Sequence, residues 1–313
     1  MGTPEFAVPA LNALVEAGHD VAAVITQPDR PRGRGKKTAC PPVKDRALAL
    51  NLPVTQPERI REAAFVQFLK DLRPEIVVVV AYGKILPKEI LQMPPNGCVN
   101  VHASLLPRYR GAAPIHRAVI NGEKETGVTT MYMEEGLDTG DLLLQAKITV
   151  GPDDTTGAVH DHLSRLGAGL LLETLALIGR GEAPRVPQDG SRSSYAPPLK
   201  AEDERIHWAR TARQIKDQVR GLNPWPGART CLGGRLVKIW RVKALEGRPG
   251  ADRPGVVVGC GADGIAVQTG AGQVLIKELQ VEGAKKMDAV DFLRGSKLAH
   301  GELFSSTKAG ETE

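Results

Sequence analysis

The sequence predicts an α/β fold: a Rossmann-like, doubly wound, mostly parallel sheet, followed by a smaller antiparallel β-barrel of oligonucleotide-binding type. Strand-like and helix-like segments alternate from residue 9 to about residue 120, which is typical of βαβ units. Beyond about residue 200, short alternating segments follow one another closely, as in a small barrel. A chain of 313 residues is long enough for two such domains.

The elements of the first domain follow from apolar periodicity and from turn residues. Residues 62–73 place Phe65, Phe68, Leu69 and Leu72 on one helical face. Residues 76–81 form a continuous β-branched run, which is typical of a strand buried on both faces. In chain order we expect a helix at 9–17, a strand at 20–26, a helix at 62–73, strands at 76–81, 97–102, 126–133 and 142–150, and a helix at 159–178.

Residues 179–198 contain four prolines and three glycines without periodicity, so we predict a linker there. The predicted boundaries are a first domain at 1–182, a linker at 183–203 and a barrel domain at 204–313. In the barrel domain we expect a helix at 211–221, strands at 235–242, 255–258, 264–268 and 273–279, and a final helix that begins after Asp288.

Composition limits the class of protein. Hydrophobic residues make up 42% and charged residues 25% of the chain, a globular profile, and no apolar run approaches the roughly 20 residues of a membrane span. The four cysteines are far apart, so neither a disulfide framework nor a cysteine–zinc site is indicated, and we expect a cytoplasmic protein. The net charge of +5 is concentrated in residues 201–313, where 18 basic and 14 acidic side chains give +4, against 23 and 22 in residues 1–200.

A second basic region lies at residues 29–37, where five basic side chains and one acidic side chain give a net charge of +4. Its proline and glycine residues argue against regular structure. It lacks the third glycine of G-x-G-x-x-G, and Lys36 is not followed by Ser or Thr, so it matches neither phosphate-loop motif. A solvated surface loop and a cationic segment suited to a phosphate backbone both remain possible.

The strongest chemical signal is in the strand expected at 97–102. Residues two apart in a strand point to the same side, so Asn100 and His102 project together where the strand ends. An amide can donate to a developing oxyanion and an imidazole can move a proton near neutral pH. The alternative is a structural histidine, with Asp138 and Asp141 serving only as turn residues.

Several motifs occur in order: G-T-P-E-F-A at the start, Q-P-D-R-P-R-G-R-G-K-K, V-V-V-V-A-Y-G-K-I-L-P, N-V-H-A-S-L-L-P-R-Y-R-G-A-A-P-I, G-L-D-T-G-D and N-P-W-P-G. In these motifs the chain resembles, over nearly its whole length, the formyltransferase family that uses 10-formyltetrahydrofolate, and within it the members that formylate initiator methionyl-tRNA. Family chains have an apolar strand before G-T-P, so we expect the opening residues to follow such a strand.

The resemblance implies a catalytic trio of Asn100, His102 and Asp138. Asp138 is preferred to Asp141 because glycinamide ribonucleotide formyltransferases keep only the first acid of this turn.

The resemblance also implies the binding surfaces. The residues expected to border the folate are Ser104, Leu105, Leu106, Pro107, Ala81, Tyr82, Gly83, Ile85 and Leu86. The residues expected to contact the acceptor end of the initiator tRNA, together with the basic barrel, are Arg30, Arg32, Arg34, Lys36 and Lys37. No metal is expected.

The implied reaction is direct attack of the methionine α-amine on the formyl carbon through a tetrahedral intermediate, by a monomer without an obligatory protein partner. Two other functions are compatible with parts of the sequence. One is formyl transfer to a small amine such as a ribonucleotide or amino sugar, which leaves the basic regions unexplained. The other is a non-catalytic RNA-binding protein, which leaves the Asn100, His102 and Asp138 combination unexplained.

Overall fold

The computed structural model describes residues 1–32, 37–245, 247, 252–296 and 298–306. The chain divides into two compact units, the first made of residues 1–114, 125–149 and 160–197, and the second of residues 115–124, 150–159 and 198–313. The chain therefore passes from one unit to the other five times, at 114/115, 124/125, 149/150, 159/160 and 197/198. The domain boundaries predicted from the sequence, 1–182, 183–203 and 204–313, stay a prediction.

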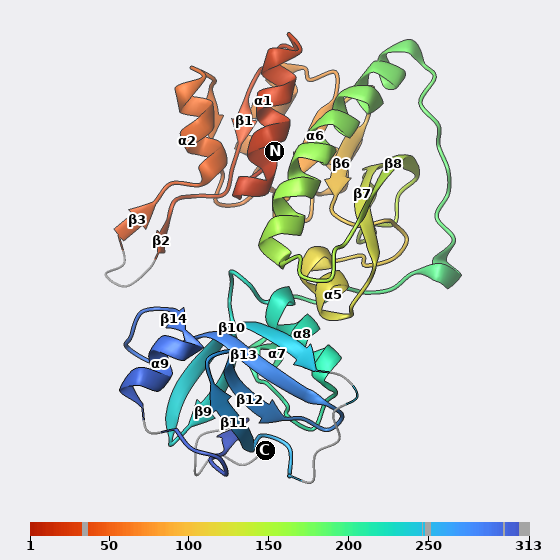
Figure 1. The fold of residues 1–313 in the computed structure, drawn as a ribbon. Coiled ribbons are helices and arrows are strands. Elements are labelled where there is room, and N and C mark those ends of the chain that lie inside the picture. The colour runs from red at the N-terminus through yellow and green to blue at the C-terminus, as the bar shows by residue number, and fades with distance from the viewer. Residues whose placement is uncertain (33–36, 246, 248–251, 297, 307–313) are drawn as a thin grey trace. The chain divides into compact units, whose positions relative to one another are not determined.

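The first unit is built on parallel strands with an antiparallel extension (Figure 1). Its strands are β1 (Val24–Ile25), β4 (Val54–Thr55), β5 (Val77–Val80), β6 (Cys98–His102), β7 (Glu125–Tyr132) and β8 (Leu142–Thr149). β1 pairs with β4 and β5 pairs with β6 in parallel, while β7 and β8 continue the β5–β6 sheet in antiparallel order. The helices are η1 (Glu5–Ala7), α1 (Val8–Glu16), α2 (Pro42–Ala49), α3 (Ala63–Leu72), α4 (Lys88–Leu91), α6 (Thr156–Arg180) and η2 (Gly190–Arg192). The predicted doubly wound, mostly parallel fold is confirmed.

The two faces of β6 have different neighbours because successive side chains alternate between them. Val101 faces α6: a Cβ added to Gly167 of that helix would lie 2.9 Å from Val101 Cγ1. Cys98 faces the other way, and its thiol donates to the carbonyl groups of Ile90 (3.6 Å) and Leu91 (3.8 Å) in α4. Asn100 and His102 are on the same face as Cys98, nearer the carboxyl end of β6.

The first two residues lie between β1 and β5. Gly2 N–H donates to Ile25 O at 3.0 Å, and Val80 N–H donates to Met1 O at 2.9 Å. The Met1 amino group donates to Val78 O at 2.7 Å, and burial lowers its pKa to about 6. Next to it is a cavity of about 440 Å³ lined mainly by apolar side chains of α1, β1 and β5.

The basic region at 29–37 contains regular structure, which corrects the sequence-based prediction. β2 (Arg30–Arg32) and β3 (Lys37–Ala39) form an antiparallel pair in which Pro31 lies opposite Thr38. In a two-stranded ladder half of the N–H groups face away from the partner strand, so a proline can occupy such a position without loss of a hydrogen bond. Arg34 and Lys36 lie outside the described residues.

The second unit is an antiparallel sheet that closes on itself, as predicted. Its elements are α5 (Pro114–Ile120), α7 (Ala201–Glu204), α8 (Ala212–Gly221), β9 (Ala228–Leu232), β10 (Arg235–Leu245), β11 (Val257–Gly261), β12 (Gly264–Gln268), β13 (Gln273–Val281), β14 (Met287–Asp288), α9 (Ala289–Gly295) and β15 (Phe304–Ser305). The strand order is β11-β12-β13-β10-β9-β15. The ends meet because Val257 N–H donates to Glu302 O and Phe304 N–H donates to Gly255 O, both at 2.8 Å. Strands β9, β14 and β15 were not expected from the sequence.

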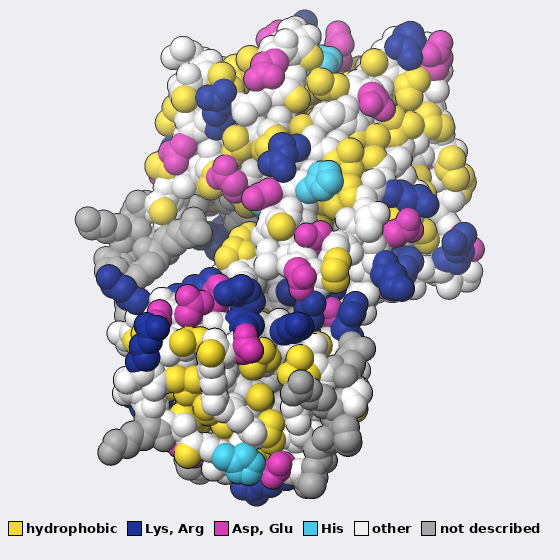
Figure 2. Space-filling model, in the orientation of Figure 1, with side chains coloured by type: hydrophobic (Ala, Val, Ile, Leu, Met, Phe, Trp, Pro, Cys, Tyr) yellow, Lys and Arg dark blue, Asp and Glu magenta, His cyan; other side chains and the backbone are white. Residues whose placement is uncertain are grey.

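The barrel encloses an apolar core, with Ile239, Val257, Ile265 and Ile276 fully buried. On the surface of this unit, Figure 2 shows Lys and Arg side chains gathered on one side, with some acidic side chains among them. Among the described residues, no helix of either unit is long and apolar enough to cross a membrane.

Candidate active site

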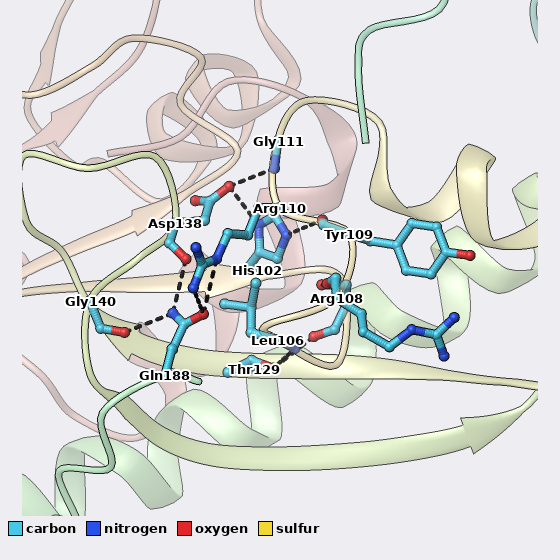
Figure 3. A network of polar contacts seen from close by, with 11 residues as sticks. His102, Leu106, Arg108, Tyr109, Arg110, Gly111, Thr129, Asp138, Gly140 and Gln188 are labelled. Atoms are coloured by element: carbon cyan, nitrogen blue, oxygen red, sulfur yellow. Dashed lines mark hydrogen bonds and ion pairs between the residues drawn. The ribbon is translucent and has the colours of Figure 1, made fainter. Parts of the chain in front are cut away.

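His102 ends β6 and is 7% exposed, with a partner at each ring nitrogen (Figure 3). Nε2 lies 3.0 Å from Tyr109 O, and Nδ1 lies 3.7 Å from Asp138 Oδ2. A carbonyl oxygen can only accept, so in the neutral ring the proton is on Nε2 and the lone pair is on Nδ1. Nδ1 is therefore the atom that can take up a proton, and the resulting cation would face the Asp138 carboxylate.

Asp138 comes from the turn between β7 and β8, far from His102 in the sequence. Its Oδ2 accepts a hydrogen bond from Gly111 N–H at 2.8 Å. Its backbone φ is +53°, in the left-handed region that few residues other than glycine adopt. The structure thus brings together two of the three predicted catalytic residues by holding this turn in a specific conformation.

Asn100, the third predicted catalytic residue, is 9% exposed and projects from β6 on the same side as His102. Within the described part of the chain, its side-chain amide has no hydrogen-bond partner. A nearly buried amide with free donors can hydrogen-bond a substrate carbonyl oxygen without first breaking a bond to the protein.

The residues predicted to border the folate lie in two loops at the same edge of the sheet. Residues 81–86 follow β5 and residues 104–107 follow β6, and the carboxyl ends of parallel neighbours are adjacent. Ile85 is 70% exposed, whereas Leu86 and Leu106 are each 3% exposed. Burial raises the pKa of Tyr82 to about 12, so this phenol is neutral. Of the set, Ala81, Gly83 and Ile85 are exposed, Leu105 and Pro107 are half-buried, and Tyr82, Leu86, Ser104 and Leu106 are buried.

Side chains of β7 and β8 fix the loop after β6. Thr129 Oγ1 donates to Ser104 O at 2.7 Å and accepts from Leu106 N–H at 3.1 Å. Gln145 Nε2 donates to Leu106 O at 2.8 Å and to Thr129 Oγ1 at 2.9 Å. The loop next to His102 is therefore held from the neighbouring strands.

Sequence reasoning missed the connecting segment, residues 183–197, which it assigned to the linker. Gln188 Nε2 donates to Asp138 O (2.9 Å) and Gly140 O (2.8 Å), and Ser194 Oγ accepts from Tyr109 N–H (2.9 Å). No periodicity marks such a segment, and its partners are 48 to 85 residues away in the chain. The polar residues among its prolines were the only available signal.

The root of the β2–β3 hairpin is fixed to the first unit by Asp29. Its carboxylate accepts from Lys44 Nζ (2.7 Å) and Gln56 Nε2 (2.8 Å), and the hydrogen bond from Lys44 holds the pKa of Asp29 below its usual range. Arg30 is exposed. The described backbone of Arg32 and Lys37 belongs to the hairpin, and Arg34 and Lys36 lie outside the described residues.

The site therefore combines a buried histidine near a carboxylate with an amide on the same strand, on a doubly wound sheet. Residues 1–175 match the family described as formyl transferase, and residues 198–297 match the formyl transferase C-terminal domain. The chain belongs to the formyl transferase family, as its motifs indicated.

Two relatives show which members of the family the chain is similar to over its whole length. The chain is 60% identical to the methionyl-tRNA formyltransferase of Pelotomaculum thermopropionicum, with 96% of each chain covered. It is 56% identical to the methionyl-tRNA formyltransferase of Moorella thermoacetica, with 97% of each chain covered. Among solved structures, the sugar 3N-formyl transferase WlaRD has a TM-score of 0.67 at 18% identity, covering 91% of this chain and 97% of that chain, a likeness in fold.

Proposed function

We propose that this protein transfers the formyl group of 10-formyltetrahydrofolate to the α-amino group of methionine on initiator methionyl-tRNA. The arrangement of His102, Asp138 and Asn100 at the carboxyl end of β6 carries the proposal. The two full-length relatives named methionyl-tRNA formyltransferase support this acceptor over a small amine. Formyltetrahydrofolate is a substrate here, and the WlaRD crystal structure was obtained in the presence of 5-N-formyl-THF.

The chemistry requires an oxyanion donor and a proton carrier. The substrate amine forms a bond to the formyl carbon, whose oxygen gains negative charge; the bond to N10 then breaks, the amine loses a proton and N10 gains one. Asn100 donates to the oxyanion, a contribution on the order of 3 kcal/mol to transition-state stabilisation. His102 takes up the proton at Nδ1, where Asp138 stabilises the cation.

We propose that the two loops after β5 and β6 contact the folate. The exposed apolar side chain of Ile85 fits the flat face of a pterin or benzoyl ring, and the fixed loop at 104–107 supplies a rigid wall. Asn100, whose side-chain amide is nearly buried, lies on β6, and β6 comes between these two loops in the sequence. A folate held by these loops would therefore present its formyl group near Asn100 and His102.

We propose that the tRNA is bound by Arg30, Arg32, Arg34, Lys36 and Lys37 in the hairpin region and by the basic barrel unit. Their positive charge suits a phosphate backbone. We also propose that the protein acts as a monomer in the cytoplasm, where its tRNA substrate is charged.

One assay tests the function. The protein is incubated with formyl-labelled 10-formyltetrahydrofolate and, in parallel, charged initiator tRNA, charged elongator methionyl-tRNA and free methionine. Label is expected in the charged initiator tRNA, at a rate well above that for free methionine. Equal transfer to free methionine would favour a small-amine enzyme, and absence of transfer to any acceptor would refute formyl transfer.

A further inference from the structure

We propose that Gln188 and Ser194 are positioning residues for the reaction, because their side chains hydrogen-bond the backbone of the two residues that contact His102. The proposal rests on the proposed function and goes beyond it: these two side chains of the 183–197 segment position the active site. Both side chains lie outside the motifs that define the predicted catalytic and binding residues.

Gln188 uses its whole hydrogen-bonding capacity on the loops of the site (Figure 3). Its Nε2 donates to Asp138 O and Gly140 O, and its Oε1 accepts from Arg110 Nε (3.1 Å) and Nη2 (2.7 Å). The amide can have only this orientation, because the reverse would place its NH₂ against the guanidinium and its oxygen against two carbonyl groups. Gln188 therefore joins the Asp138 turn to the loop that contains Arg110.

Ser194 acts on the other side of His102. Its Oγ accepts from Tyr109 N–H, and its backbone oxygen accepts from Arg110 N–H at 2.9 Å. Tyr109 O is the acceptor for His102 Nε2. The Ser194 backbone oxygen therefore holds the Tyr109–Arg110 peptide, whose carbonyl determines which nitrogen of His102 has the proton, and the Ser194 side chain holds Tyr109 from its N–H side.

The two residues held in this way have the same unfavourable backbone conformation. Tyr109 has φ +60° and Asp138 has φ +53°, both in the left-handed region. Such conformations in non-glycine residues cost free energy and persist only where the surroundings fix them. One short segment supplies a side-chain tether to each, and each tethered residue contacts one nitrogen of the catalytic imidazole.

The tethers predict a specific kinetic effect. If the Asp138 carboxylate moves away from Nδ1, the imidazole cation that forms during the reaction loses its nearby negative charge, and the chemical step becomes slower. Substrate binding does not depend on this contact, so kcat should change while both KM values should not. Because misplacement of catalytic groups by about 1 Å costs up to about 100-fold, we expect kcat to fall about 10- to 100-fold.

Two matched pairs of variants test the proposal. Gln188→Glu keeps an acceptor for Arg110 but places a carboxylate against Asp138 O and Gly140 O, whereas Gln188→Ala removes both functions. Ser194→Ala removes the acceptor for Tyr109, whereas Ser193→Ala removes only a hydrogen bond to Gly190 O within the same segment. The full-length protein is assayed with 10-formyltetrahydrofolate and charged initiator tRNA for kcat, for KM of each substrate and for thermal unfolding.

We expect Gln188→Glu and Ser194→Ala to lower kcat, with both KM values within about twofold of wild type, and Ser193→Ala to match wild type. Full kcat in Gln188→Glu and Ser194→Ala, or a loss that appears in KM alone, would overturn the proposal. A loss in Gln188→Ala with none in Gln188→Glu would also overturn it, because Gln188 would then act only through Arg110.

Hydrogen–deuterium exchange tests the tethers without substrate. Amides of residues 109–111 and 136–140 should exchange faster in Gln188→Glu and Ser194→Ala than in Ser193→Ala. Equal exchange in all three variants would overturn the tethering. If the wild-type protein forms no formylated product but this difference is found, the proposed function fails while the positioning of His102 stands.

Discussion

At the scale of single residues, the geometry of the site depends on backbone positions as much as on the side chains proposed to be catalytic. His102 is fixed by a carbonyl on one nitrogen and a carboxylate near the other. The carboxylate is itself fixed by the N–H group of Gly111. A change at any of these positions should affect catalysis through the geometry of the imidazole.

Replacement of His102 should separate chemistry from binding. His102→Ala is expected to lower kcat by about 10²- to 10⁴-fold, the usual contribution of a general acid–base group. Affinity for charged tRNA should remain close to wild type because the proposed tRNA-binding residues are elsewhere. Steady-state kinetics and a filter-binding measurement check both parts, and an equal loss of affinity would contradict the role given to His102.

Gly111→Ala should distort the site because the added methyl group would clash with residues 195 and 196. Gly111 has φ +115°, and an added Cβ would lie 2.7 Å from Tyr195 Cε2 and 2.8 Å from Ala196 O. We expect a loss of about 1–3 kcal/mol in the free energy of unfolding, measured by chemical denaturation, together with a lower kcat. Gly190→Ala, which meets nothing within 4 Å, is the control and should stay near wild type in both measurements.

At the scale of elements, α6 packs against the face of β6 opposite to Asn100 and His102. Gly167 lets the helix approach β6 and β7 closely, since its missing Cβ would lie 2.9 Å from Val101 Cγ1 and 3.3 Å from Val128 Cγ1. Both valines are β-branched and buried, so neither can move aside easily.

Alanine substitutions in α6 should therefore have opposite effects at two nearby glycines. Gly167→Ala is expected to lower the free energy of unfolding by about 1–3 kcal/mol through overpacking. Gly169→Ala, where no atom lies within 4 Å of the added Cβ, should raise it by about 0.5–1 kcal/mol through helix propensity. Denaturant titration measures the free energy of unfolding of both variants. If both substitutions changed it by the same amount, α6 would not pack as described.

The hairpin region gives a prediction that depends on charge alone. Arg34→Ala should raise KM for charged tRNA and reduce the slope of log KM against log salt by about 0.7–0.9, as expected for one lost phosphate contact. Arg61→Ala removes the same charge from an exposed position outside the hairpin region and should leave the slope unchanged. Kinetics across a salt series measure the slope, and identical slopes in the two variants would mean that Arg34 makes no such contact.

Periodicity predicted the long elements well and the irregular ones poorly. The helix expected at 62–73 is α3 (Ala63–Leu72), and the strand expected at 97–102 is β6 (Cys98–His102). Both have apolar patterns that specify burial. The β2–β3 hairpin was missed because its prolines and glycines look like a loop, and strand 20–26 is reduced to β1 (Val24–Ile25).

The proximity of the proposed catalytic side chains was partly predictable from the sequence, and the residues that support them were not. Asn100 and His102 are two residues apart in a strand, so local geometry places them together. The proximity of Asp138 follows in sequence terms only from the family resemblance. Gln188 and Ser194 act across the fold, and no local pattern can indicate which loop a polar side chain reaches.

At the scale of the whole molecule, segments 115–124 and 150–159 are parts of the second unit although they lie between parts of the first in the sequence. Arg117, in the first of these segments, makes a bidentate ion pair with Asp203, with distances of 2.7 and 2.8 Å. Arg220 Nη1 donates to Asp154 O at 3.0 Å, in the second segment. These contacts hold both segments to the C-terminal part of the chain.

The Arg117–Asp203 pair predicts a pH-dependent stability. Arg117 holds the pKa of Asp203 below its usual range, so the stabilisation is complete above the unfolded-state value near 3.9 and is lost as pH falls through the lower folded-state value. Asp203→Asn is expected to cost about 1–2 kcal/mol near pH 7, and the difference from wild type should shrink as pH falls below about 4.

Chemical denaturation from pH 7 to pH 3 measures this difference, with Asp263→Asn, whose carboxylate is 91% exposed, as the control. A difference between wild type and Asp203→Asn that does not change with pH would contradict the ion pair as its source.

The chain crosses between the two units five times, and this limits which chimeras can be made between this protein and its relatives. A chimera that takes residues 198–313 from another member would combine a foreign barrel with resident segments 115–124 and 150–159. Each donor would have to supply side chains equivalent to Asp203 and Arg220, or the graft would lose the contacts that these make with Arg117 and the carbonyl of Asp154. Exchange at a single junction should therefore succeed among close relatives and fail among distant ones.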